Sequence, residues 1–155
     1  MTESEQLVQT TIRSGDATLC AADGGELVYG LTGRGISALL TAVEEERVVS
    51  HGPLDWGDKL VGRAAALLLT LVRPRSVFAL TMSTGAQDVL RTAGIPFTRD
   101  TVILDVFNRT GTGPCPMEAA VSGINEPFAA LETLKQVSQA LSDAGRNHAP
   151  RKGST

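Results

Sequence analysis

The sequence has few residues that form cross-links or bind soft metals. Its 155 residues include two cysteines and two histidines, without any Cys-x-x-Cys or His-x-x-x-His pattern. Four soft ligands in all argue against a closed zinc site, and cysteines as far apart as Cys20 and Cys115 do not form a disulfide framework. We therefore expect a reduced, cytoplasmic protein that contains no metal and no other cofactor.

Positive charge and long apolar runs are also scarce. The formal net charge is -3 at pH 7, whereas binding to nucleic acid requires a basic face that neutralises phosphates. The longest uninterrupted apolar run, residues 64–69, is far shorter than the ~18–20 residues of a membrane-spanning helix. The acidic start, residues 1–5, lacks the basic and apolar regions of a secretory signal. We expect neither nucleic acid nor a membrane as a partner.

The length and the apolar content are, in contrast, sufficient for a hydrophobic core. Hydrophobic residues make up 42% of the chain, and a chain of this size buries roughly 68–70% of the surface that its unfolded form exposes. We predict one domain over residues 1–142, followed by a disordered C-terminal tail over residues 143–155.

Hydrophobic periodicity predicts strands and helices that alternate after an opening hairpin. The hairpin joins residues 17–22 to residues 26–31 through Asp23-Gly24-Gly25, because two glycines supply the positive φ of a tight turn. The other predicted elements are helices at 3–13, 36–43, from the turn at 56–58 to about 72, 86–92, 115–122 and 126–142, and extended segments at 48–54, 76–82 and 98–107. The acidic residues 44–46 oppose the dipole of the second helix, so we expect fraying there. This order predicts a three-layer α/β/α sandwich around a mixed, mostly parallel sheet of about five strands.

The corners between strands and helices are the expected place for a site, because open α/β sheets bind ligands beyond the carboxyl ends of their strands. At the first corner, Lys59 and Arg63 lie four residues apart at the predicted start of the apolar helix, beside Gly62 and free N–H groups. This arrangement suits the phosphate or carboxylate of a small anionic ligand. The alternative is structural, because Asp58, Asp105 or a glutamate would neutralise the same cations.

The second corner is Ser83-Thr84-Gly85, where a pair of hydroxyl groups meets a predicted helix start. Ser and Thr side chains commonly cap helices by accepting hydrogen bonds from the first N–H groups. The same three residues are also candidates for a loop that contacts a ligand.

The third corner runs from Asn108 to Glu118 and contains the candidate catalytic residues. Its glycines allow close approach of a ligand, and Cys115 falls in the first turn of a predicted helix, where the dipole favours the thiolate. Glu118, three residues further on, is a candidate general acid or base. The alternatives are that Cys115 is an inert, space-filling residue and that Glu118 belongs to a capping box. Cys20 lies inside a predicted strand and is expected in the core.

Two segments carry a resemblance to a known family. Gly62-Arg63-Ala64-Ala65-Ala66 and Cys115-Pro116-Met117-Glu118, in this order of elements, resemble a small prokaryotic family in the cytidine-deaminase-like superfamily, over about residues 5–142. The resemblance implies an α/β/α sandwich around a mixed sheet of about five strands. It implies no particular reaction.

The zinc enzymes of that superfamily use an H-x-E helix and a P-C-x-x-C helix. Pro114-Cys115-Pro116-Met117 matches the start of the second motif, but Glu118 replaces the second cysteine, and residues 62–66 contain neither histidine nor glutamate. This comparison argues against zinc-dependent base deamination. A metal held by Cys115, Glu118 and His51 is the remaining alternative, because mixed S, O and N ligands do bind zinc.

These residues leave three functional hypotheses. The first is a zinc-independent, cysteine-dependent enzyme acting on a small anionic or nucleotide-like ligand, with Cys115 as nucleophile and with Lys59 and Arg63 holding the ligand. The second is a non-catalytic small-ligand-binding or regulatory domain that uses the same corner. The third is a structural homo-oligomer whose interface is the last predicted helix.

Overall fold

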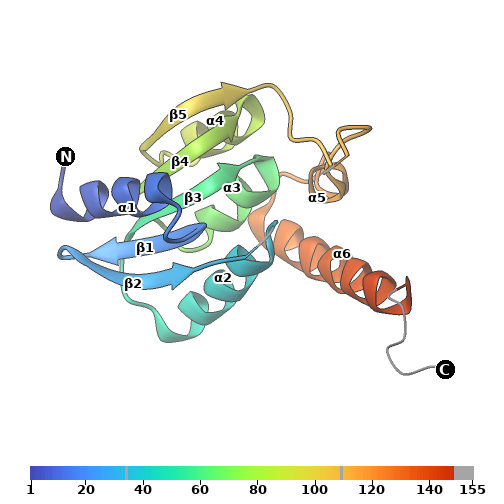
Figure 1. Cartoon of the computed structure of the whole chain (residues 1–155), viewed down its shortest axis with the longest axis horizontal. Helices are drawn as coiled ribbons and strands as arrows, with labels where there is room; N and C mark the ends of the chain where they lie inside the picture. Colours follow the sequence, from blue (N-terminus) through green and yellow to red (C-terminus); the bar gives the residue numbers. More distant parts are fainter. Residues whose placement is uncertain (34, 109, 149–155) are drawn as a thin grey trace.

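The computed structural model describes residues 1–33, 35–108 and 110–148. Helices and strands alternate through most of this part of the chain (Figure 1). In chain order the elements are α1 (Glu3–Ser14), β1 (Leu19–Asp23), β2 (Glu26–Leu31), α2 (Ser37–Val49), β3 (Asp55–Val61), α3 (Arg63–Thr70), β4 (Ser76–Ser83), α4 (Thr84–Thr92), β5 (Phe97–Ile103), α5 (Pro116–Ala120) and α6 (Pro127–His148).

The strands form one mixed sheet in the order β2-β1-β3-β4-β5. Strand β1 pairs antiparallel with both β2 and β3, and β3, β4 and β5 run parallel to one another. The hairpin turn uses Gly24 and Gly25, both at positive φ. The α/β class, the mixed sheet of five strands and the opening hairpin are therefore confirmed.

Helices flank both faces of this sheet (Figure 1). Helix α1 packs on β1, β3 and β4 through an apolar cluster that includes Val8, Ile12 and Phe78. It approaches β3 most closely at Gly57, where a Cβ atom would overlap Val8 Cγ1. The larger core lies against the other face, beneath α2, α3 and α4, and α6 packs on the outside of α3. The expected layering is thus present.

The segment that we expected to turn into the apolar helix is instead the central strand. Residues 56–58 belong to β3, which continues to Val61 and pairs with β1 on one edge and β4 on the other. Helix α3 begins only at Arg63. Apolar residues on both sides of Gly62-Arg63 concealed this boundary, because buried strands and buried helices are both rich in apolar residues. Lys59 therefore lies on a strand, and its predicted place beside Arg63 on one helix face is wrong.

Helix α2 continues through the acidic residues 44–46 to Val49, where we expected fraying and then an extended segment. The reason is tertiary. Glu46 is buried and accepts hydrogen bonds from the Tyr29 hydroxyl at 3.0 Å and from the His51 backbone N–H at 2.9 Å. Because its carboxylate is satisfied by groups outside the helix, packing outweighs the unfavourable dipole.

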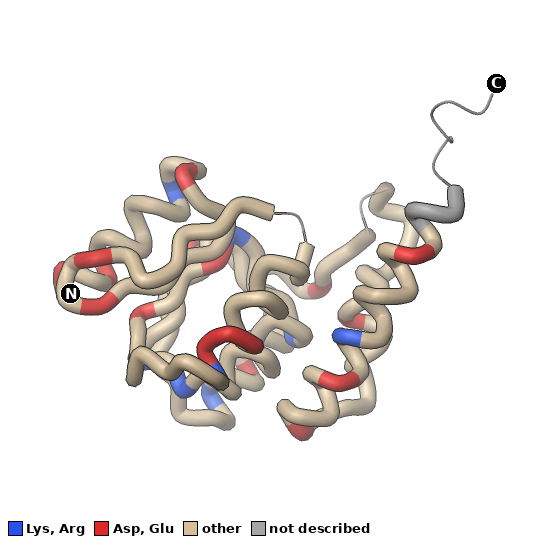
Figure 2. The backbone as a smooth tube through the Cα atoms, turned by 90° about the horizontal axis from the view of Figure 1, so that it is seen from below, with Lys and Arg blue, Asp and Glu red and all other residues tan. Residues whose placement is uncertain are grey.

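The C-terminal part differs from expectation in its boundaries. Strand β5 ends at Ile103 rather than near residue 107, and α5 is a single turn. Helix α6 runs to His148, so it continues into the segment from residue 143 that we expected as a disordered tail; residues 149–155 lie outside the described residues. Figure 2 shows α6 along one side of the molecule, with acidic and basic residues along it. No helix in the described ranges is long and apolar enough to cross a membrane.

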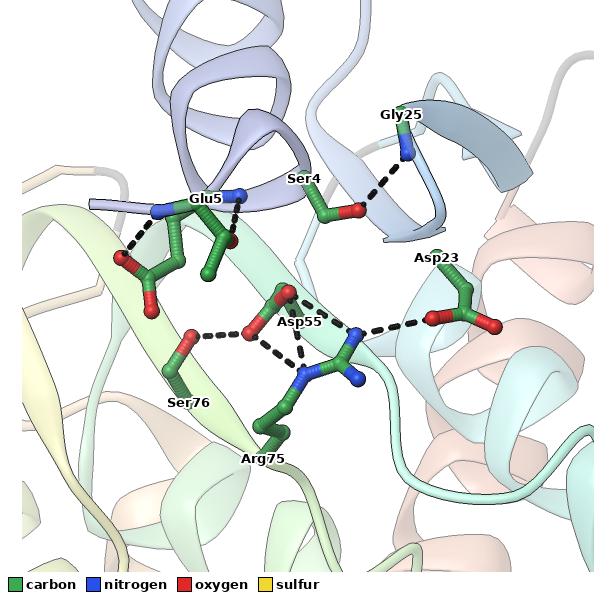
Figure 3. A network of polar contacts seen from close by, with 8 residues as sticks. Ser4, Glu5, Asp23, Gly25, Asp55, Arg75 and Ser76 are labelled. Atoms are coloured by element: carbon green, nitrogen blue, oxygen red, sulfur yellow. Dashed lines mark hydrogen bonds and ion pairs between the residues drawn. The ribbon is translucent and has the colours of Figure 1, made fainter.

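A buried carboxylate, Asp55, joins the amino ends of β3 and β4 (Figure 3). Its side chain is 1% exposed and accepts hydrogen bonds from Arg75 Nη2 at 3.0 Å and from Ser76 Oγ at 2.6 Å. The same guanidinium also binds Asp23 at the end of β1, at 3.0 Å. Hydrogen bonds to Asp55 and Asp23 raise the pKa of Arg75. One arginine therefore ties three strands together at this edge of the sheet.

Candidate functional site

Three helices begin at the carboxyl edge of the parallel strands. Gly62 is the N-cap of α3, Ser83 is the N-cap of α4, and Cys115 is the N-cap of α5. Helix α3 contacts both α4 and α5, so these helix starts are neighbours in space. The topology therefore brings the three predicted corners to one edge of the sheet, which is where α/β domains bind ligands.

The acidic group at the start of α3 belongs to the protein itself. Glu118 Oε2 accepts a hydrogen bond from the Ala64 backbone N–H at 3.1 Å. The fit is close, because a Cβ atom at Gly62 would overlap Glu118 Oε1 and would lie 2.9 Å from Val106 Cγ2. Burial raises the pKa of Glu118, against the hydrogen bonds from the N–H groups of Ala64 and Arg63. The two segments that carry the family resemblance are thus in direct contact.

The raised pKa of Glu118 makes the stability of the fold depend on pH. The native state holds the proton of the Glu118 carboxyl group more tightly than the unfolded chain does. The resulting contribution to the stability of the fold is therefore complete below the unfolded pKa and is lost as pH rises through the native pKa. We expect Glu118→Gln, which keeps an acceptor for the Ala64 N–H, to reduce the loss of stability between mildly acidic and neutral pH. Urea unfolding at both pH values measures this difference. Glu132→Gln, on the exposed side of α6, is the control, and an equal effect there would contradict the assignment.

Arg63 is held by hydrogen bonds to other parts of the chain. Its Nη1 donates to the carbonyl oxygen of Val121, and its Nη2 donates to the carbonyl of Ile124 and, at 2.7 Å, to Asn125 Oδ1. These acceptors lie in the connection between α5 and α6. Arg63 therefore fastens that connection to the start of α3, and Lys59 is left exposed on β3.

Asp58 is a second acid near this edge. It is partly buried on β3, and burial raises its pKa to about 7, opposed by hydrogen bonds from the backbone N–H groups of Leu60 and Lys59. Within the described ranges it forms no ion pair with Lys59 or Arg63. Of the acids proposed as structural partners at the first corner, it is a glutamate, Glu118, that meets the start of α3.

The second corner is organised by helix capping. Ser83 Oγ accepts a hydrogen bond from the Ala86 N–H at 3.1 Å, and Thr84 Oγ1 donates to the carbonyl oxygen of Leu104 at 3.2 Å. At Gly85, an added Cβ atom would lie 3.6 Å from Arg63 Cβ, so α4 begins directly beside the arginine. The hydroxyl groups are engaged in capping and in holding the loop after β5.

The loop before α5 is organised around Asn108. Its Oδ1 accepts hydrogen bonds from the Thr112 N–H and the Thr110 hydroxyl, both at 3.1 Å. Its backbone N–H donates to the carbonyl oxygen of Gly113 at 2.9 Å. Asn108 therefore shapes the loop that leads to Cys115.

The two thiols have opposite environments. Cys20 is completely buried, and burial, with the nearby charge of Asp58, raises its pKa to about 12. Cys115 is partly exposed, and its backbone N–H donates to the carbonyl oxygen of Val106 at 3.0 Å. Because α5 has only five residues, shorter than the predicted helix, its dipole is small and favours the thiolate less than we expected. What distinguishes Cys115 is its access to solvent and its place three residues before Glu118 in the chain.

A different group of polar residues was missed by the sequence reasoning. His51 Nδ1 lies 2.6 Å from Glu46 Oε1, which also accepts the Tyr29 hydroxyl. No motif spacing connects these residues, because Tyr29 comes from β2 and His51 from the loop after α2. The alternative of a metal held by Cys115, Glu118 and His51 is wrong for the described part of the chain, where no three metal-binding side chains come together.

Comparison with known proteins identifies relatives but no activity. A family model described as TM1506, domain of unknown function (DUF1893), matches residues 7–137. A crystal structure of a DUF1893 family protein, TM1506 from Thermotoga maritima, is similar over 88% of this chain and 90% of that chain, with a TM-score of 0.79 and 21% sequence identity. At this identity the likeness concerns the fold alone. None of the curated proteins matches this chain.

Proposed function

We propose that this chain, which belongs to the DUF1893 family of domains of unknown function, is a zinc-independent enzyme. Its nucleophile is Cys115. The observation that carries this proposal is an accessible thiol at the N-cap of α5, three residues before a partly buried carboxyl group of raised pKa, at the carboxyl edge of the sheet. The mixed sheet of five strands between helices also supports the cytidine-deaminase-like classification implied by the sequence resemblance.

The roles of the two residues follow from their chemistry. The Cys115 thiolate attacks an electrophilic carbon of the substrate, so that an S–C bond forms while the π bond from that carbon to oxygen or nitrogen breaks. The heteroatom then needs a proton, and Glu118 is suited to donate it because a raised pKa keeps the carboxyl group protonated to higher pH. Cys115 is accordingly the nucleophile and Glu118 the general acid.

The substrate that we propose is a small anionic or nucleotide-like molecule. Arg63 binds carbonyl oxygens of its own chain, so its part is to position α5 and α6 around the site. The exposed Lys59 is the cation of the first corner that remains for an anionic group. Ser83, Thr84, Gly85 and Asn108 form the walls of this edge.

The first test is selective alkylation. With iodoacetamide near neutral pH, Cys115 is expected to react about 100-fold or more faster than Cys20, because a buried thiol reacts only when the fold opens locally. Mass spectrometry of digested protein measures both rates, and Cys115→Ser shows the rate of Cys20 alone. Equal labelling of the two cysteines, or a protected Cys115, would overturn the proposal.

Alkylation at one pH reports only whether the Cys115 thiol is accessible, so the role of Glu118 needs a second measurement. If Glu118 exchanges protons near the thiol, Glu118→Gln should change the pH profile of Cys115 alkylation, whereas Glu132→Gln should leave the profile as it is. A profile unaffected by Glu118→Gln would remove Glu118 from the chemistry.

A second candidate function is a non-catalytic small-ligand-binding or regulatory domain. The observation that favours it is that Arg63 and Glu118 both bind groups within the chain. A thermal-shift screen with nucleotides identifies a ligand, because a ligand of the native state raises the melting temperature. If Cys115→Ser binds that ligand unchanged and the intact protein does not convert it, the binding domain is correct and the enzyme is not.

A further inference from the structure

The opposite edge of the sheet contains a hollow that the proposed chemistry does not use. It has a volume of about 450 Å³ and lies between the end of α2, the loops that lead into β3 and β4, and the end of α3. These loops precede the parallel strands, so the hollow is at the amino edge, across the sheet from Cys115. The residues that line it are Glu46, Arg47, Ser50, Gly52, Pro53, Leu71, Val72 and Arg73.

A hydrogen-bonded network forms one side of this hollow. Glu46 has a side chain that is 5% exposed, and its Oε1 is shared by the Tyr29 hydroxyl and by His51 Nδ1. Glu46 Oε2 accepts the backbone N–H of His51. The carboxylate thus fixes both the ring and the backbone of His51, which leaves the second ring nitrogen of His51 available to another partner.

The aromatic surroundings hold this network in place. The ring of Tyr29 stacks on Trp56 with centroids 5.4 Å apart and meets the ring of His51 edge-on at 5.6 Å. Burial acts to raise the pKa of Glu46, but the hydrogen bonds from His51 and Tyr29 outweigh it and hold that pKa below its usual range. Glu46 is therefore an ionised, internally satisfied group whose charge is directed at His51 and Tyr29.

The backbone around the hollow is constrained in an unusual way. In the described ranges, the non-glycine residues with positive φ are Ser50 at 44° and Arg73 at 47°, and both line the hollow. Such conformations cost about 1–3 kcal/mol each and persist where the surrounding structure imposes them. They place the loop before β3 and the loop before β4 on two sides of the same space.

The charges that remain available at the hollow are positive. Arg73 is exposed, and its guanidinium group forms no ion pair or hydrogen bond with the residues that the structure describes. Arg47 lies over the ring of Phe128, 4.9 Å from the ring centroid. Of the neighbouring acids, Glu44 binds Lys135 at 3.1 Å. Two arginines therefore line a space whose own carboxylate, Glu46, is already satisfied.

We infer that this hollow is a binding site for a small oxyanion, a phosphate or a carboxylate, held by Arg73 and Arg47 with His51 at its rim. Planar guanidinium groups bind such anions through paired hydrogen bonds. Pro53, Leu71 and Val72 provide an apolar wall for the body of a ligand that carries the anionic group. The site is separate from Cys115, so this inference does not depend on the proposed enzymatic function.

The test uses the ring protons of histidine, because the chain has two histidines. Proton NMR of the full chain is recorded during titration with inorganic phosphate and, separately, with acetate, at constant ionic strength. His148→Gln assigns the two resonances. We expect a saturable shift of the His51 resonance with phosphate or acetate, and the stronger of the two identifies the class of anion.

Matched variants decide whether the arginines carry the binding. Arg73→Gln should weaken the binding about tenfold or more, as expected for the loss of a charged hydrogen bond. Arg73→Lys should retain part of it, and Arg99→Gln, which removes an exposed charge on β5, should leave it unchanged. Circular dichroism confirms that each variant is folded. No saturable shift of His51, or equal weakening by Arg73→Gln and Arg99→Gln, would overturn the inference. Cys115→Ser should bind as the original chain does.

Discussion

Gly62→Ala is expected to lower the free energy of unfolding by about 1–3 kcal/mol, the usual cost of overpacking a filled site. The backbone at Gly62 has φ -93°, which alanine adopts readily, so the cost comes from crowding alone. The added Cβ would overlap Glu118 Oε1 and crowd Val106. Relief requires the carboxyl group to leave the Ala64 N–H, and with it the contact that holds α5 on α3.

Two comparisons separate this crowding from a general effect of replacing glycine. Gly123→Ala is the same change at a position where a Cβ would meet nothing within 4 Å, so urea unfolding should show little loss. Glu118→Ala removes the overlapping carboxyl group, so Gly62→Ala combined with Glu118→Ala should cost less than the sum of the single variants. Additive costs, or an equal loss at Gly123, would show that Glu118 is not the obstacle.

Arg75→Met is expected to lower the free energy of unfolding by about 3 kcal/mol or more, because it leaves a buried carboxylate without its cation. Asp55 is 1% exposed and would retain the hydroxyl of Ser76 as its remaining side-chain donor. The link from β3 to Asp23 on β1 would be lost in the same step. The effect should appear as a lower midpoint in urea unfolding.

The control for Arg75 is an arginine with similar bonds at the surface. Arg13 donates to both carboxylate oxygens of Asp100, at 2.9 and 2.8 Å, but both side chains are well exposed. Exposed ion pairs contribute little, so Arg13→Met should be far milder. Adding Asp55→Asn to Arg75→Met removes the unpaired charge and should restore part of the stability. Equal losses for the two arginines, or no recovery, would contradict this account of Asp55.

The two edges of the sheet differ in the state of their charged groups. At the carboxyl edge, Arg63 and Glu118 are satisfied by carbonyl and N–H groups of the same chain. At the amino edge, Arg73 has no such partner among the described residues, and Glu46 fixes the ring of His51. This difference is the basis on which we propose chemistry at the carboxyl edge and anion binding at the amino edge.

Much of the fold was predictable because its signals are local. Glycines at 24 and 25 impose their turn, and the apolar periodicity of α1 and α6 needs no knowledge of the neighbouring elements. The boundary between β3 and α3 was not predictable, because apolar residues lie on both sides of Gly62-Arg63, at the end of a strand and in a buried helix. Only pairing with β1 and β4 shows where the strand ends. Lys59 was misplaced for that reason.

The candidate site divides in the same way. Position in the sequence sufficed to place Cys20 inside a strand and Cys115 at a helix start, and to indicate an anion at the start of the apolar helix. Only the tertiary structure decided that this anion is Glu118, that Arg63 binds carbonyl groups, and that Tyr29, Glu46 and His51 meet. The physical reason is that such contacts join residues from different elements. They depend on strand order and on packing distances, which residue type and spacing along the chain do not specify.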